Sequence, residues 1–507
     1  MRAIPLSYLP TALVAILALV PVVVLAILAA DTPQIFDPHN IRVLLNTLVL
    51  VIFTAIGAIL VGVPLALLTA YVELPFRRVW LVLLAAPLAM PSYIGAFTLY
   101  AAFGQGGELE TWLGFSFPAV RDMPGAVLVM TLYTYPFVLL TTRSALRSLD
   151  TNQVNAARTL GMSFSVCLLK VVLPRAVTGI AAGGLLAALY ALSDFGTPAI
   201  MQVDTFTRVI YVEYNAFGLS QAAMLSLQLL CIVALLLFLE SRVKGSHETP
   251  GRPLSLWPTR WQTGMMMFAI LPVLLLAIFL PLLVFSIWLF REGSAGFEFS
   301  YALNSTYASV LAAIVAVVLA LPVAHAAIRG KIGRIMERIT YLGFGVPGIV
   351  MGTALVYIGL QLPFLYQTLG LLVIAYVFRF LPLAVGSVRT ASERLDPSLV
   401  NAARLLGATP KEAFRRITLP LTMRGIVAGA ALVFLEAMRE LPATLMLGPT
   451  GFETLATYLW RVYEAGYFGR AAVPGLLLIL MSVLVLMLML TGERRSEIEL
   501  SDTEDKR

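Results

Sequence analysis

Apolar segments long enough to cross a bilayer recur along the whole chain. Each is close to the roughly 20 residues that a helix needs to span the hydrocarbon core. A polar stretch rich in Gly and Pro, residues 241–263, divides them into two sets of six. The segments lie at 11–30, 43–70, 80–103, 124–146, 174–197 and 218–240, and then at 264–290, 303–328, 339–360, 368–388, 420–446 and 471–491. This pattern predicts an all-α polytopic membrane protein with about 12 transmembrane helices.

Two of the polar connections are copies of one another. Residues 149–174 read LDTNQVNAARTLGMSFSVCLLKVVLP, and residues 395–420, 246 positions later, read LDPSLVNAARLLGATPKEAFRRITLP. The positions that stand out are Asn155, Ala156, Ala157 and Gly161 in the first copy and Asn401, Ala402, Ala403 and Gly407 in the second. Because a polar loop is repeated without a gap between apolar segments, it favours a recognition surface. The alternative is an amphipathic connector that lies on the lipid.

Each copy predicts a short helix, a glycine break and a second helix. In the second copy, Asp396 and Thr409 are the expected N-caps and Gly407 the expected left-handed end of the first helix. The same places in the first copy are held by Asp150, Ser163 and Gly161. The Ala-Ala pair leaves a thin helix face that fits a groove on a partner, and Ala157 and Ala403 are expected to face that groove.

The duplication extends beyond these loops. The repeated features are Asn46-Thr47 with Asn304-Ser305, Pro64 with Pro322, and Gly179-x-x-x-Gly183 with Gly425-x-x-x-Gly429. Glycines four residues apart let helices pack closely in lipid. Six helices per half give both halves the same orientation, whereas inverted repeats need an odd number. The chain therefore divides into parallel halves at 1–240 and 264–492, joined by a cytoplasmic linker at 241–263 and followed by a disordered tail at 493–507.

Composition agrees with a membrane protein. Of the 507 residues, 59% are hydrophobic and 12% charged, about half the charged fraction of a soluble domain. Most lysines and arginines fall in the even-numbered loops, which places both termini and both repeated loops in the cytoplasm of a bacterial inner membrane. The net charge of +7 therefore indicates loops facing the cytoplasm and not nucleic-acid binding. Two Cys and three His residues form no local ligand set, so a metal site stays unassigned.

The pattern Ala-Ala-x-x-x-Gly, followed about a dozen residues later by Leu-Pro, resembles the cytoplasmic coupling loop of permeases in binding-protein-dependent ABC importers. Those loops usually begin Glu-Ala-Ala, and here Asn155 and Asn401 stand in the place of the Glu. The resemblance implies docking of two copies of a cytoplasmic ABC ATPase subunit, and delivery of substrate by one periplasmic binding protein.

The chain carries no phosphate-binding loop of its own. Gly330-Lys331 is followed by Ile332 and lacks the upstream glycine, and no catalytic Ser–His–Asp or Cys–His motif is present. We therefore expect no enzyme activity, no catalytic residue and no bound cofactor in this chain. ATP would be used by the partner ATPase.

Four charged residues lie late in two corresponding apolar segments, where ionisable groups are costly and indicate function. Asp194 is followed 246 residues later by Glu440, with Glu436 and Arg439 nearby. Their position in these segments places them toward the periplasm. One interpretation is that they line a translocation pathway. The other is structural: Arg439 pairs with Glu436, and Asp194 caps the segment that begins at Gly196.

The segments SDFGTPAIM and MRELPATLML, with the sequence that follows the second, resemble the two halves of fused ferric-iron importer permeases. This resemblance implies ferric iron as the substrate. Carboxylates suit a hard cation, but the same acids would also attract a polyamine or thiamine. Permeases for thiamine, polyamines or phosphonates therefore stay open as alternatives, and an ion-gradient-driven secondary transporter is a further one.

Overall fold

The computed structural model describes residues 8–30, 37–104, 106–149, 151–242 and 259–484. These residues form helices and connections, without a β-strand among them. The helices of the first half are α1 (Tyr8–Ala29), α2 (Pro38–Tyr71), α3 (Arg77–Ala85), η1 (Ala86–Ala89), α4 (Ser92–Ala102), α5 (Glu108–Leu113), α6 (Asp122–Arg147), α7 (Thr151–Thr159), α8 (Phe164–Cys167), η2 (Leu168–Val172), α9 (Leu173–Ser193), α10 (Gly196–Ile200), α11 (Phe206–Asn215) and α12 (Leu219–Arg242).

The second half repeats this order. Its helices are α13 (Arg260–Leu274), η3 (Leu275–Phe279), α14 (Leu280–Glu292), α15 (Phe299–Arg329), α16 (Lys331–Gly345), α17 (Gly348–Gln361), α18 (Leu369–Glu393), α19 (Pro397–Leu405), α20 (Pro410–Ala413), η4 (Phe414–Thr418), α21 (Leu419–Met438), α22 (Pro442–Leu447), α23 (Leu455–Glu464) and η5 (Phe468–Ala471). The first helix of this half begins at Arg260, inside the predicted linker. Most of the linker, 243–258, and the predicted tail lie outside the described residues.

The all-helical membrane fold is confirmed. Nine helical stretches of the described chain are long and apolar enough to cross a membrane, or ten when the pair α3–η1 and α4, bent by 93°, counts as one span. The predicted span 339–360 is instead split at Pro347 into α16 and α17, because proline cannot continue a helix without losing a hydrogen bond. The last predicted span is described only as far as Leu484. The number twelve therefore stays a prediction.

Each half is built on the same three-helix core. Helices α2, α6 and α9 pack together in the first half, and α15, α18 and α21 do so in the second. The repeated glycines make this packing possible. A Cβ on Gly183 would lie 2.5 Å from the Cα of Val138 in α6, and one on Gly425 would lie 2.7 Å from the carbonyl oxygen of Ser387 in α18. The close helix approach that the sequence predicted is confirmed.

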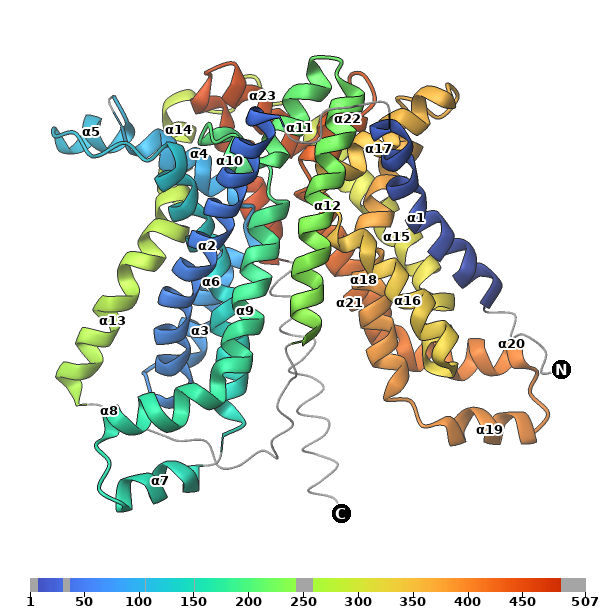
Figure 1. Cartoon of the computed structure of the whole chain (residues 1–507), viewed down its shortest axis with the longest axis horizontal. Coiled ribbons are helices and arrows are strands. Elements are labelled where there is room, and N and C mark those ends of the chain that lie inside the picture. The colour runs from blue at the N-terminus through green and yellow to red at the C-terminus, as the bar shows by residue number, and fades with distance from the viewer. Residues whose placement is uncertain (1–7, 31–36, 105, 150, 243–258, 485–507) are drawn as a thin grey trace.

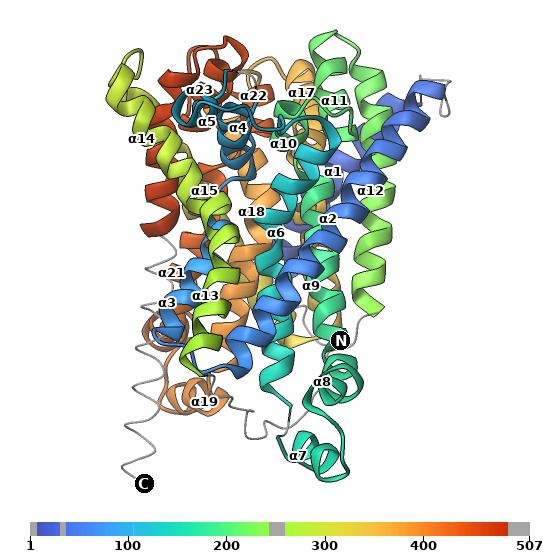
Figure 2. The ribbon, with the colours of Figure 1, turned by 90° about the vertical axis from the view of Figure 1, so that its left-hand side faces the viewer.

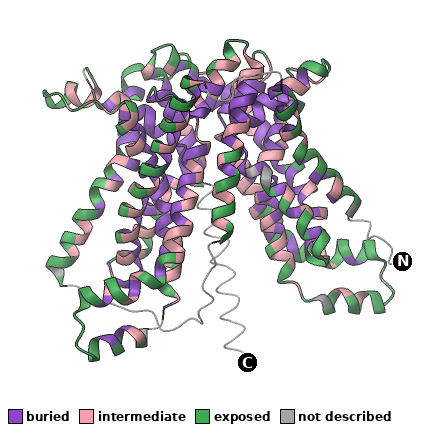
Figure 3. Cartoon of the chain, viewed as in Figure 1, coloured by how far each residue is buried: buried purple, intermediate pink, exposed green. Residues whose placement is uncertain are grey.

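The halves exchange their first helices. Helix α1 packs on α15, α16 and α17 of the second half, while α14 packs on α4 of the first half. Figure 1 shows two bundles that lie close together at the end that carries α11 and α22 and far apart at the end that carries α7 and α19. The view turned by 90° in Figure 2 shows α7 and α19 again at one end. Buried residues gather where the bundles meet, and α7 and α19 are largely exposed (Figure 3).

The repeated Asn-Thr and Asn-Ser pairs have a matching structural role. The Asn46 side chain donates to the carbonyl of Asp204, and Thr47 Oγ1 accepts from the Phe206 amide at 3.1 Å, which holds the start of α11. In the second half, Asn304 donates to the carbonyl of Glu453, and Ser305 accepts from the amide of Leu455 at 2.8 Å at the start of α23. These side chains satisfy backbone groups at helix N-termini that lack partners within the helix.

Two predicted spans end earlier than expected. The segments 174–197 and 420–446 were predicted as continuous helices, but α9 ends at Ser193 and α21 ends at Met438. The chain then turns into the short helices α10 and α22. Pro198 and Pro442 lie within the first turns of these helices, where their fixed φ suits a new helix start. Asp194 and Glu440 therefore lie at breaks between helices, not inside a continuous span.

A π-helical turn precedes each of these two long helices. The turns η2 and η4 occupy equivalent positions and are each followed by Leu-Pro, at Pro174 and Pro420. A proline removes the amide that would bond to the carbonyl four residues earlier, and the wider turn accommodates this loss. The repeated loops are thus joined to α9 and α21 through continuous helix that includes one wide turn.

Candidate functional site

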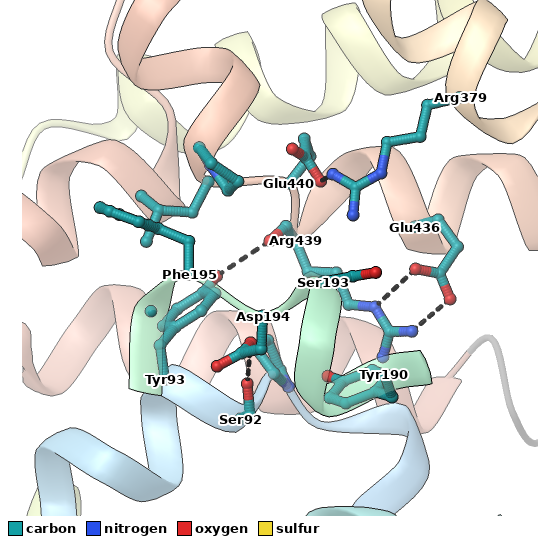
Figure 4. A pocket seen from close by; sticks show the side chains of 14 residues that line it. Ser92, Tyr93, Tyr190, Ser193, Asp194, Phe195, Arg379, Glu436, Arg439 and Glu440 are labelled. Carbon is teal, nitrogen blue, oxygen red and sulfur yellow. Dashed lines mark hydrogen bonds and ion pairs between the residues drawn. The ribbon is translucent and has the colours of Figure 1, made fainter. Parts of the chain in front are cut away.

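A small cavity lies where the helix breaks of the two halves meet. Its volume is about 90 Å³, and its lining comes from residues 91–93, 190, 193–196, 436 and 439–442, together with Arg379 of α18. We call it the junction pocket (Figure 4). All four candidate pathway residues lie on its wall, although they come from segments 246 residues apart. The structure therefore brings all four residues together, and their role in a translocation pathway stays a prediction.

On the first-half side, Asp194 is held by neutral donors. Its carboxylate accepts from Ser92 Oγ at 2.6 Å and from the amide of Thr197 at 2.9 Å. The second bond caps α10, as the structural interpretation expected. No arginine or lysine of the described chain lies within ion-pair distance of this carboxylate. Asp194 thus contributes an acid to the pocket while serving the local backbone.

On the second-half side, Glu440 takes the equivalent capping position and is paired with a cation. Its carboxylate accepts from the Ala443 amide at 3.2 Å and forms an ion pair with Arg379. The side chain of Glu440 is 5% exposed and that of Arg379 is 16% exposed. The pair has room because residue 348 is glycine: a Cβ there would collide with both the Arg379 guanidinium and the Glu440 carboxylate.

Arg439 connects the two halves. It forms an ion pair with Glu436, as the structural interpretation expected, and also donates to the carbonyls of Leu88 and Ala89 at 3.0 and 3.1 Å. Those carbonyls belong to the break between η1 and α4, where the membrane helix bends and its backbone needs other partners. From the same break, Tyr93 donates its hydroxyl to the carbonyl of Arg439 at 3.3 Å (Figure 4). These contacts hold the halves together at the pocket.

The junction pocket combines three carboxylates with two guanidinium groups. Each acid is engaged: Glu436 and Glu440 by arginines, and Asp194 by Ser92 and the backbone. Within the described residues, no group of three or more His, Cys, Asp or Glu side chains is arranged to hold a metal ion. The pathway interpretation and the structural interpretation therefore both concern these residues, which line the pocket and also pair with or cap their neighbours. This cluster of ion pairs and hydrogen bonds lies where the helix breaks of the two halves meet.

Sequence reasoning missed Arg379, Ser92 and Tyr93. Arg379 was detectable, because it is an ionisable residue within the predicted span 368–388, which is the signal that identified Glu436. The other two carry no charge and lie on a helix that the sequence did not connect with α9 or α21. Only the fold brings their hydroxyl groups to the pocket.

The repeated loops adopt the predicted helix–glycine–helix form. Gly161 has φ +86° and Gly407 has φ +90°, both in the left-handed region. In the first copy the amides of Gly161 and Met162 bond to the carbonyls of Arg158 and Ala157. The second copy has the same two bonds, from Gly407 to Arg404 and from Ala408 to Ala403. Each helix therefore ends in a Schellman motif, as the glycine spacing implied.

Both predicted N-caps of the second copy form side-chain hydrogen bonds, whereas Ser163 of the first copy forms none. Asp396 accepts from the Ser398 amide at 2.8 Å, and this bond lowers the pKa of the Asp396 carboxyl. Thr409 and Glu412 form a reciprocal capping box, and the Thr409 amide lowers the pKa of the Glu412 carboxyl. The prediction for Ser163 is wrong: it occupies the N-cap position, but its side chain makes no capping bond. Asp150 lies outside the described residues.

The exposed face of α7 differs from the predicted one. Asn155, Ala156, Asn401 and Ala402 are exposed. Ala157 is only 7% exposed, because it shares with Val154 the face of α7 that packs on α8. Its expected place in a partner's groove is therefore corrected: Ala156 faces outward instead. In α19, Ala402 is exposed and Ala403 is half-buried, so the place of Ala403 in a groove stays a prediction. Three leucines at the helix ends, Leu160, Leu405 and Leu406, are 82%, 89% and 89% exposed.

A polytopic helical chain built from two repeated halves is typical of a membrane permease. Its sequence matches the model of the family described as the binding-protein-dependent transport system inner membrane component at residues 62–244 and 316–496. The chain belongs to this family, and it contains the family's domain twice.

Known relatives support the same assignment. The chain is 30% identical over 472 residues to the Fe(3+)-transport system permease protein FbpB 2 of Haemophilus influenzae, covering 90% of each chain. It is 25% identical to the probable ABC transporter permease protein y4fN of Sinorhizobium fredii, covering 79% of this chain and 78% of the relative. A probable molybdenum ABC transporter permease protein of Haloferax volcanii is 30% identical over 37% of this chain and 69% of its own length.

Proposed function

We propose that this chain is the fused two-half permease of an ATP-driven importer for ferric iron in a bacterial inner membrane. The observation that carries the proposal is the pairing of one ion-paired pocket between the halves with two equivalent exposed helices, α7 and α19, at the opposite end. The iron assignment is supported by the relative from Haemophilus influenzae, which is named for Fe(3+) and aligns along nine-tenths of both chains.

The proposed topology follows the distribution of lysine and arginine. Both termini and the loops that carry α7 and α19 lie in the cytoplasm, and α11, α22 and α23 lie toward the periplasm. Two copies of a cytoplasmic ABC ATPase subunit bind α7 and α19, while one periplasmic binding protein delivers the iron to the other face. The chain itself catalyses no reaction and binds no cofactor.

The mechanism uses the rigid connections in the chain. When the two ATPase subunits close on ATP, they bring α7 and α19 toward one another. The helices α9 and α21 continue from these loops to Asp194 and Glu440, so motion at one end rotates the residues of the junction pocket at the other. Separation of the halves breaks the contacts of Arg439 with Leu88 and Ala89, and the three carboxylates then face the solute.

Uptake in a defined system tests this proposal. The chain is reconstituted in liposomes with the ATPase and binding protein that co-purify with it, and uptake of radiolabelled ferric iron, thiamine, putrescine and a phosphonate is measured. We expect ATP-dependent uptake of iron, and no ATP hydrolysis by the purified chain alone. Uptake that persists without the ATPase and follows an imposed ion gradient would instead establish a secondary transporter. ATP-dependent uptake of another solute would keep the importer and replace its substrate.

A further inference from the structure

Three arginines gather at the α7 end of the first half. Arg143 and Arg147 are one turn apart at the end of α6, and Arg77 begins α3. Arg77 donates to the carbonyls of Thr69 and Ala70 and pairs with Glu73. Arg143 reaches the same Thr69 carbonyl at 3.5 Å. We call these three residues the arginine cluster. In the described part of the chain, no carboxylate lies within 4.0 Å of Arg143 or Arg147.

The second half carries acids around the equivalent arginine. Arg389 corresponds to Arg143 at the repeat distance of 246, and Glu393 corresponds to Arg147. Arg389 Nη1 donates to both carboxylate oxygens of Glu337 at 2.9 and 2.7 Å, and its Nε donates to Glu393 at 2.8 Å. Glu337 is buried on α16. The same helix end is therefore neutralised by acids in one half and cationic in the other.

Among the described residues, the arginine cluster has one carboxylate partner, Glu73, for three positive charges. Arg77 and Arg147 are both positively charged neighbours of Arg143, and like charges held this close repel one another. Guanidinium groups form paired, charge-assisted hydrogen bonds with phosphate, whose oxygens match their fork of donors. Arg147 is exposed and Arg143 half-buried, so an anion can reach both.

The surroundings of the cluster identify the source of the anion. Beside Arg77, the apolar side chains of Phe76, Val79 and Val82 are 81%, 53% and 36% exposed. Half-buried Trp80 lies among them and donates to the carbonyl of Pro75. An outward apolar face with a tryptophan and arginines at its end is typical of a helix at the headgroup level of a bilayer.

We propose that the arginine cluster binds the phosphodiester of an anionic lipid, such as phosphatidylglycerol, in the leaflet on the α7 side. Its acyl chains lie along Val79 and Val82 of α3. Basic pockets between membrane helices bind lipid headgroups by this chemistry. The site lies beside the start of the first repeated loop, so the bound lipid stabilises the end of α6 that leads into α7. The second half needs no lipid there because Glu337 and Glu393 supply the negative charge.

Lipid binding by the purified full-length chain in detergent tests the site. A fluorescent short-chain phosphatidylglycerol is titrated into the wild type and into the double variant Arg143→Gln/Arg147→Gln, for which we expect about tenfold weaker binding. The matched control is Arg334→Gln/Arg338→Gln, which removes the same charge from an exposed face of α16 on the same side of the second half. It should change affinity less than about twofold. An equal loss in both double variants would overturn a specific site.

Two single variants keep the test independent of folding. Arg147 is exposed, so Arg147→Lys and Arg147→Glu should both remain monodisperse in gel filtration. The lysine variant should retain binding, and the glutamate variant, which copies the second half, should lose it. Phosphatidylcholine and free inorganic phosphate at the same concentration should not displace the probe. Displacement by inorganic phosphate would assign the site to a soluble anion, and binding retained by Arg147→Glu would exclude the arginine cluster.

Discussion

The two halves share a backbone plan but distribute their charged residues differently. At the junction pocket the second half is charged and the first nearly neutral: Glu436, Arg439, Glu440 and Arg379 correspond to Tyr190, Ser193, Asp194 and Tyr133. At the α7 and α19 end, the first half has an arginine cluster, whereas the second has ion pairs. The comparison indicates that duplication preserved the geometry of helices and breaks, while charge diverged separately at each end.

The contrast at the pocket has a physical basis in packing. Tyr133 donates its hydroxyl to the carbonyl of Ala277 at 3.1 Å and fills the space beside Gly95. In the second half, Gly348 leaves space in which Arg379 reaches Glu440. The second half thus places an ion pair on the pocket wall, whereas the equivalent ring of the first half, Tyr133, lies outside the pocket lining. In the proposed mechanism, we therefore expect opening to cost more on the second-half side, since separated buried charges lose their partners.

The largest expected effect is the difference in stability loss between the variants Glu440→Gln and Asp194→Asn. Glu440→Gln leaves the Arg379 guanidinium buried without its counterion, which should destabilise the chain by about 3 kcal/mol. Asp194→Asn keeps one of the two acceptor oxygens, so it loses only one of the bonds from Ser92 and the Thr197 amide, and should cost about 1 kcal/mol. Both should reduce uptake. Thermal unfolding in detergent and uptake in liposomes measure the two effects.

The double variant Arg379→Met/Glu440→Gln provides the control for this comparison. Removing both charges should recover most of the stability lost in Glu440→Gln, because no unpaired cation remains. Uptake should stay low if the pair belongs to the pathway. Equal destabilisation by Glu440→Gln and Asp194→Asn would show that the asymmetry of the pocket has no energetic consequence.

Repetition in the sequence predicted the repeated loops and the glycines, because two copies at a fixed distance reveal local structure. It also placed Asp194 and Glu440 in one site, since equivalent positions in parallel repeats meet at the axis between them. For the break before α10, only the structural interpretation, in which Asp194 caps the segment that begins at Gly196, gave an indication. The break before α22 was not predicted, because the apolar pattern of 420–446 continues past it. The exchange of α1 and α14 between the halves leaves no sequence signal, because lipid-facing and helix-facing apolar residues look alike.

The second effect concerns the exposed faces of α7 and α19. Ala156→Glu/Ala402→Glu places carboxylates on the outward faces, so we expect normal folding, loss of the ATPase on co-purification and loss of uptake. Ala157→Glu instead buries a carboxylate between α7 and α8 and should destabilise the first loop itself. Hydrogen exchange of residues 151–167 separates the two causes. Full retention of the ATPase by the exposed double variant would make the repeated loops surface connectors.

The third effect should be the same in both halves. Gly161→Ala and Gly407→Ala each force a Cβ into the left-handed region, at a cost of about 1 kcal/mol. A Cβ at either position would meet no atom within 4 Å, so backbone strain is the whole cost. Hydrogen exchange at the ends of α7 and α19 should report similar losses of protection. A clear difference between the two variants would show that the loops are not equivalent in local stability.

The smallest effect distinguishes the caps of α20 and α8. Thr409→Ala removes the hydroxyl that accepts from the Glu412 amide at 3.3 Å, whereas Ser163 makes no side-chain capping bond. We therefore expect about fivefold faster amide exchange in the first turn of α20 for Thr409→Ala, and little change in α8 for Ser163→Ala.

The pKa of the Glu412 carboxyl is lowered in the folded loop, so its capping bond is present at neutral pH. Its contribution should fade as the pH falls below about 4.3, the ordinary glutamate pKa, toward the lowered folded value. Glu412→Gln should remove this acid dependence from α20, while α8 should show none in either protein. An acid dependence of equal size in α8 would mean that the capping box is not its source.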